Sequence, residues 1–156
     1  MGAGQRDGTG SHAGRMEPLT LSGLTDESLL LLDSAPIIYV LERHPQFASR
    51  FLPLFEAHAA GRFAFAVTTI TIAEVLTGPF QAGDETLARR YRAILESWQV
   101  VALDSVIAES AARFRATLRL KLPDAVQLAS ALAIGADALV THDRDFSNVR
   151  GLRIVS

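Results

Sequence analysis

Leu29-Leu30-Leu31-Leu32-Asp33-Ser34-Ala35-Pro36 is the stretch of sequence that decides the fold. Four consecutive apolar residues followed by a polar pair have the length of a strand buried on both faces. Proline is accepted in the first turn of a helix, where its missing N–H would have no partner in any case. We therefore predict a strand at Leu29–Asp33 and a helix at Ala35–Arg43, with the carboxylate of Asp33 where the two meet.

The same alternation continues outward from this stretch. Further apolar runs predict strands at 63–68, 99–103, 138–141 and 152–155. Helical patterns lie between them, at 46–61, 70–77, 84–98, 105–118 and 123–134. Gly78-Pro79 is expected to close the helix at 70–77. Short apolar strands separated by helices pair in parallel and need helices on both faces. The predicted fold class is therefore α/β: one three-layer domain with a central, mainly parallel sheet of four to five strands flanked by helices.

The first 27 residues differ from the rest. Small and polar residues dominate, as in the run Gly8-Thr9-Gly10-Ser11. Such a segment buries too little apolar surface to offset the entropy lost on ordering. We predict a mobile tail at 1–27 and the folded domain at 28–156. Met16 is a candidate for the true first residue, in which case 1–15 are extraneous.

Composition excludes several classes of protein. A length of 156 residues suits one domain with a sizeable core. The net charge of −2 argues against a purely electrostatic nucleic-acid binder but allows a local basic rim. The absence of cysteine excludes disulfides, thiolate catalysis and cysteine zinc sites. No apolar run reaches the ~20 residues of a membrane-spanning helix. We expect a cytoplasmic protein with no membrane partner.

Four acids lie where apolar segments begin or end: Asp33, Glu74, Asp124 and Asp143. Ligands of open parallel sheets bind beyond the carboxyl ends of the strands, so we expect the four to share one rim. Each has a structural alternative except Glu74, which has no lysine or arginine within one helical turn. Asp33 can cap a helix, Asp124 suits a helix N-terminus, and Asp143 can form a turn.

The four acids together predict a metal site. Two carboxylates about 4 Å apart repel by on the order of 4 kcal/mol at an effective dielectric of about 20, so a shared pocket needs a cation. Oxygen ligands without histidine or cysteine select Mg²⁺, or Mn²⁺ as a substitute. Such ions activate water and stabilise the charge that develops on a phosphodiester.

Five further residues are auxiliary candidates for orienting a carboxylate, a water or a phosphate. Each also has an ordinary structural role as a cap, strand or loop residue. They are Ser34, Thr71, Lys121, Thr141 and Asp145. His142, beside Asp143, is the only histidine near the predicted site.

The chain resembles the PIN-domain ribonucleases, and among them the VapC-type toxins of bacterial toxin–antitoxin pairs. The matching segments occur in family order and are Leu32–Tyr39, Thr69–Val75, Lys121–Ala125 and Val140–Phe146. The resemblance implies an endonuclease that uses Mg²⁺ or Mn²⁺. It gives the acid roles to Asp33, Glu74, Asp124 and Asp143: Asp33 and Asp124 bind the metal, and Glu74 and Asp143 act directly or through water. Ala35 departs from the polar residue common at that position.

The resemblance also implies partners. Substrates of the family are RNAs, often tRNA or rRNA. Its toxins commonly form homodimers and are silenced by a small antitoxin of the VapB type. Because that antitoxin often binds DNA, any contact of this chain with DNA is expected to be indirect. The alternatives are a PIN-fold nuclease outside toxin–antitoxin systems and a degenerate PIN module that binds RNA or protein without cleavage. A phospho-receiver and a haloacid-dehalogenase-like phosphatase fit less well, because Asp33 lacks the second acid that each requires.

Overall fold

A parallel sheet forms the centre of the protein, which a computed structural model describes from residue 19 to residue 156. Five strands pair in parallel, in the order β3-β2-β1-β4-β5. Their bounds are β1 Ser28–Leu32, β2 Phe63–Thr68, β3 Gln99–Val101, β4 Ala138–Val140 and β5 Arg153–Val155. The predicted α/β class, with a parallel sheet of four to five strands, is confirmed.

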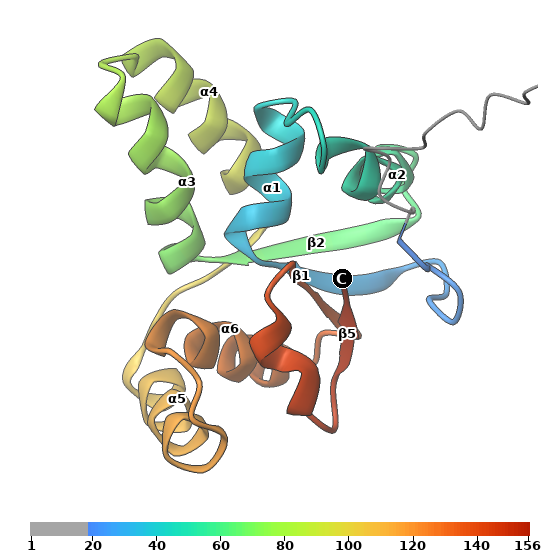
Figure 1. Ribbon diagram of the computed structural model, residues 1–156, viewed down its shortest axis with the longest axis vertical. Coiled ribbons are helices and arrows are strands. Elements are labelled where there is room, and N and C mark those ends of the chain that lie inside the picture. Colours follow the sequence, from blue (N-terminus) through green and yellow to red (C-terminus); the bar gives the residue numbers. More distant parts are fainter. Residues whose placement is uncertain (1–18) are drawn as a thin grey trace, which may run out of the picture.

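Helices cover both faces of this sheet (Figure 1). On one face lie α1 (Ser34–Leu41), α2 (Ala48–Ala59), α3 (Thr69–Gln81) and α4 (Glu85–Glu96). On the other lie α5 (Ser105–Leu118) and α6 (Leu122–Ala133). A short 3₁₀ helix, η1 (Arg144–Asn148), connects β4 to β5. The three-layer arrangement is therefore the predicted one.

The apolar run of β1 feeds two separate cores. Leu30 and Leu32 pack with α1 to α4, whereas Leu31 packs with α5 and α6. All three are fully buried. Successive side chains of a strand point to opposite faces, so a strand covered on both sides must be apolar throughout. This is why the run of leucines in β1 predicts the layered fold.

The prediction that Gly78-Pro79 closes its helix was wrong. Helix α3 continues through both residues to Gln81, and the backbone N–H of Ala82 then donates to the Gly78 carbonyl at 3.1 Å. Proline in a helix interior leaves the carbonyl four residues earlier without its partner. Pro79 is buried within the helix that it was expected to end.

The segment before β1 takes part in the fold. Leu19 is 7% exposed and belongs to the core on the α1 side, and Leu21 and Leu24 pack against it. The packed part of the chain therefore starts before Ser28. The rest of the predicted tail, residues 1–18, lies outside the described residues. Within residues 19–156, no helix is long and apolar enough to cross a membrane.

Candidate active site

The strand order creates a crevice between β1 and β4. From β1 the chain moves to β2 and β3 on one side, whereas β4 and β5 lie on the other. Such a switch point, at the carboxyl ends of parallel strands, is where open α/β sheets bind ligands. Asp33 directly follows β1 and Thr141 directly follows β4. The Thr141 hydroxyl donates to Asp33 Oδ2 at 2.9 Å, which joins the two strand ends.

Asp33 is held on both carboxylate oxygens. Oδ1 accepts from the Ser34 backbone N–H at 2.9 Å and from Gln127 Nε2 at 3.0 Å, while Thr141 holds Oδ2. The bond to Ser34 caps α1, so the capping role suggested by the sequence is present. The other two bonds fix the carboxylate at the crevice. Asp33 therefore has a structural role and a position suited to chemistry.

Gln127 is the residue that the sequence interpretation missed. It is fully buried on α6, where Nε2 donates to Asp33 and also to Thr71 Oγ1 at 2.6 Å. Its Oε1 accepts from Thr68 Oγ1 at 2.9 Å. A glutamine inside an apolar helical segment, three residues after Asp124, was the available signal. Residues three apart lie on the same face of a helix, so Gln127 is expected beside any site that contains Asp124.

Three carboxylates converge opposite Asp33. Asp124 in the first turn of α6, Asp143 after β4 and Asp145 in η1 each offer an oxygen within 4.8 Å of the others. Asp124 is 7% exposed, and its Oδ2 is buried with no hydrogen-bond partner among residues 19–156. Asp143 Oδ1 accepts from the Asp145 N–H at 2.8 Å. Asp145, taken from sequence as an auxiliary residue, lies within the acid cluster.

The electrostatics of Asp124 reflect this crowding. Burial, a hydrogen bond with Asp143 and the charges of Asp143, Asp33 and Asp145 together raise its pKa from 3.8 to about 7. Desolvation and like charges both disfavour the ionised form of a carboxyl. Without a compensating cation, part of this acid is protonated near neutral pH. A cation bound at Asp124 would give Oδ2 a partner and would lower the raised pKa of this carboxyl.

Glu74 reaches the same crevice from α3. Partial burial and then the charge of Asp33 raise its pKa above the usual 4.5, while a hydrogen bond with Ser34 acts in the opposite direction. Together with Asp33, Asp124 and Asp143, it lines a cavity of about 290 Å³, here called the acid cavity. The four acids named from sequence thus share one rim. The remaining lining residues are Ser34, Ala35, Tyr39, Pro123 and His142.

The other auxiliary candidates fall into two groups. Thr71 and Thr141 are fully buried behind the acid cavity, where they bind the carboxylate network rather than the open space. Thr141 also accepts from the Asp143 N–H at 3.0 Å. Lys121 is exposed at the start of α6 and does not line the acid cavity. Its role as a phosphate contact stays a prediction.

The donor set fits a hard divalent cation. The polar side chains that line the acid cavity within residues 19–156 are carboxylate, hydroxyl and histidine groups, and the carboxylates outnumber the others. Oxygen ligands with several negative charges suit Mg²⁺ or Mn²⁺. A cation among them would neutralise the repulsion that raises the pKa of Asp124.

Comparisons with known proteins agree with this geometry. The family model for the PIN domain matches residues 30–152. A toxin–antitoxin complex from Klebsiella pneumoniae contains a chain that is 26% identical, with a TM-score of 0.65, covering 81% of this chain and 96% of the other. Comparison with curated proteins gave no significant match.

Two further solved structures share the fold at lower identity. VapBC2 from Rickettsia felis, bound to a promoter DNA fragment, has a TM-score of 0.64 at 18% identity, over 81% of this chain and 96% of the other. VapC20 from Mycobacterium tuberculosis, described as a toxin that cleaves the sarcin–ricin loop, has a TM-score of 0.63 at 16% identity, over 76% and 92%.

Proposed function

This chain belongs to the PIN-domain family, and on that premise we propose that it is a Mg²⁺-dependent endoribonuclease, the toxin of a toxin–antitoxin pair. The observation that carries the proposal is the convergence of acids from four separate segments on one cavity at the switch point of the sheet. So many carboxylates in one crevice destabilise the fold unless they bind a cation. Their presence together in one cavity therefore points to metal chemistry.

The chain's own residues divide the work. Asp33, Asp124 and Asp143 would hold the ion in the acid cavity, with Asp145 at its edge. Gln127 and Thr141 orient Asp33, so its oxygens face the site in one fixed geometry. The bound metal supplies an activated water and stabilisation of the charge on the cleaved phosphodiester.

Glu74 is the candidate proton acceptor. It stands apart from the Asp124–Asp143–Asp145 cluster but lines the same cavity, and its raised pKa gives it more affinity for a proton than an ordinary glutamate has. A base is most effective when its pKa approaches the working pH. Glu74 would take the proton from the attacking water at its carboxylate.

The direct test is cleavage of RNA by the purified protein. We expect cleavage of tRNA or rRNA with Mg²⁺ or Mn²⁺, none with EDTA, and none by Asp33→Asn, whose side chain keeps the shape of aspartate. Glu109→Gln, a change on an exposed surface pair of α5, is the matched control and should cleave normally. Equal cleavage by Asp33→Asn and the control would refute the proposal. If the wild type binds RNA without cleaving it, the chain is a non-catalytic PIN module instead.

The partner is the second half of the proposal. The Klebsiella structure, 26% identical to this chain, is a toxin–antitoxin complex. We expect a small VapB-like antitoxin, encoded by a neighbouring gene, to bind this chain, and we expect the toxin to be a homodimer. Expression of the chain alone should arrest bacterial growth, and co-expression with the neighbouring small reading frame should restore it. Normal growth with abundant folded protein would contradict the toxin role.

A further inference from the structure

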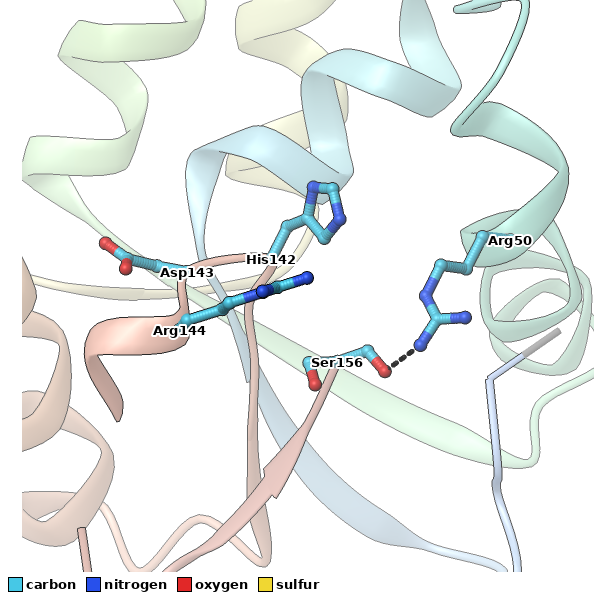
Figure 2. A pocket seen from close by; sticks show the side chains of 5 residues that line it. All are labelled: Arg50, His142, Asp143, Arg144 and Ser156. Atoms are coloured by element: carbon cyan, nitrogen blue, oxygen red, sulfur yellow. Dashed lines mark hydrogen bonds between the residues drawn. The ribbon is translucent and has the colours of Figure 1, made fainter. Parts of the chain in front are cut away.

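A second cavity, of about 180 Å³, adjoins the acid cavity and shares His142 and Asp143 with it. It is here called the arginine cavity, because Arg50 and Arg144 line it, together with Ser156. In Figure 2, Arg50 extends from α2 and Arg144 from the start of η1 toward the space between them. The Asp143 carboxylate points away from that space in the same view.

The arginine cavity brings two guanidinium groups together on a chain whose net charge is −2, with the Asp143 side chain also in its lining. Arg144 is exposed and forms no salt bridge within residues 19–156. Arg50 donates through Nη2 to a backbone oxygen of Ser156, the last residue of the sequence, and this bond holds its side chain at the cavity wall. Both guanidinium groups line the same cavity as the His142 imidazole.

His142 forms a fixed wall between the two cavities. The Tyr39 hydroxyl lies 3.1 Å from His142 Nδ1, and the ring centroid of Phe47 lies 4.8 Å from that of the imidazole in an edge-on contact. The Phe51 ring lies 5.9 Å away, also edge-on. A ring held on several sides does not rearrange easily. The spacing between the acid cavity and the arginine cavity is therefore built into the fold.

We propose that the arginine cavity is an anion subsite that binds a phosphate of the RNA strand adjacent to the phosphodiester held at the acid cavity. Arg144 is the main ligand and Arg50 the second. The planar guanidinium matches phosphate oxygens with two parallel hydrogen bonds. This inference rests on the proposed function, since it takes RNA as the substrate of the neighbouring site.

The position of His142 between the two cavities favours RNA over an acidic peptide as the occupant of the arginine cavity. A nucleic-acid strand carries phosphates at regular intervals, so a strand whose reacting phosphate lies at the acid cavity presents another phosphate across His142. Phosphate contacts of this kind fix the register of a strand without reading its sequence. The subsite would thus place the cleaved bond over the acids.

The test measures RNA binding separately from cleavage. A fluorescent 12-nucleotide single-stranded RNA is titrated against Asp124→Asn protein with and without Arg144→Gln, and anisotropy is read over a range of salt concentrations. We expect Arg144→Gln to weaken binding about tenfold, the loss of one hydrogen-bonded charge pair. The slope of log affinity against log salt should fall by about 0.7 for a single strand. Arg115→Gln, an exposed charge on α5, is the matched control and should change neither value.

A second arm locates the contact on the RNA. A neutral methylphosphonate replaces one phosphodiester linkage of the RNA at a time. Replacement at one position should weaken RNA binding by the protein that keeps Arg144 but not by Arg144→Gln. Unchanged affinity of Arg144→Gln while the wild type still cleaves RNA would overturn the subsite and leave the proposed function intact. Absence of any cleavage by the wild type would overturn the proposed function instead. Normal RNA affinity with lost binding of an acidic protein partner would assign the arginine cavity to that partner.

Discussion

Asp124→Asn should stabilise the metal-free protein at pH 8, although it removes a proposed metal ligand. The unfolded chain ionises Asp124 at its ordinary pKa of 3.8, whereas in the fold the pKa is about 7. Between these values the folded state binds more protons than the unfolded state, so stability falls as pH rises. Asn carries no charge at any pH and is free of this loss.

The size of the effect follows from the pKa change. Each unit of difference between the pKa in the folded state and the pKa in the unfolded state changes the free energy of unfolding by about 1.4 kcal/mol. The rise from 3.8 to about 7 therefore sets an upper limit of about 4 kcal/mol. The advantage of Asn should be small at pH 4, grow through pH 5 and 6, and level off above pH 7.

Urea denaturation in EDTA, at several pH values from 4 to 8, measures this difference. Subtracting the wild-type unfolding free energy from that of Asp124→Asn at each pH removes the titrations that both proteins share, including that of Glu74. Glu109→Gln, from an exposed ion pair, should show a flat difference within about 1 kcal/mol. Adding Mg²⁺ at pH 8 should stabilise the wild type more than Asp124→Asn. A difference that does not change with pH would refute the electrostatic account of the acid cavity.

Three other changes test parts of the same structure. Gln127→Leu keeps the volume but removes all three hydrogen bonds of the amide, so we expect a loss of about 1–3 kcal/mol in urea denaturation and slower cleavage at saturating RNA; normal cleavage would show that Asp33 needs no such support. Thr141→Val should lower the cleavage rate and cost about 1 kcal/mol, because the hydroxyl joins Asp33 to the Asp143 N–H; an unchanged rate would contradict this. Phe146→Ala should cost about 3–5 kcal/mol by thermal or urea unfolding, because this residue of η1 is fully buried in the core on the α5 and α6 side of the sheet; a loss below about 1 kcal/mol would show that the cavity left by the ring collapses.

Much of the fold could be predicted because β1 and its neighbours obey simple rules. Strands buried on both faces must be apolar, and the runs at β1, β2 and β4 satisfy that rule without interruption. The position of Asp33 followed from the end of such a run. Strand ends could therefore be placed within about two residues. Strand β3, for example, was predicted to end at Leu103 and ends at Val101.

The errors came where tertiary packing overrides a local rule. Gly78-Pro79 normally ends a helix, but α3 continues to Gln81 with Pro79 buried inside it. The helix η1 was not predicted, because a five-residue 3₁₀ turn has no periodicity to detect. Its turn brings Asp145 to the acid cluster. Backbone geometry of this kind cannot be deduced from residue type alone.

The acids and their supports were not equally visible in the sequence. Charged residues at the ends of apolar runs are conspicuous, and Asp33, Glu74, Asp124 and Asp143 were found in that way. Gln127 is neutral and sits among apolar residues, so only its contacts with Thr68, Thr71 and Asp33 reveal its importance. The direct metal ligands remain a prediction, to be tested by the variants above.

The bonds that hold Asp33 have a consequence for synthesis of the chain. Its partners Gln127 and Thr141 lie 94 and 108 residues later in the sequence. The ribosome must therefore have synthesised the chain past Asp145 before the acid cavity can assemble. A growing chain that ends before Asp124 carries Asp33 and Glu74 as separate acids, with no cluster to bind a cation. A chain interrupted before Thr141 would lack the hydroxyl that holds Asp33 Oδ2 and two of the three clustered acids.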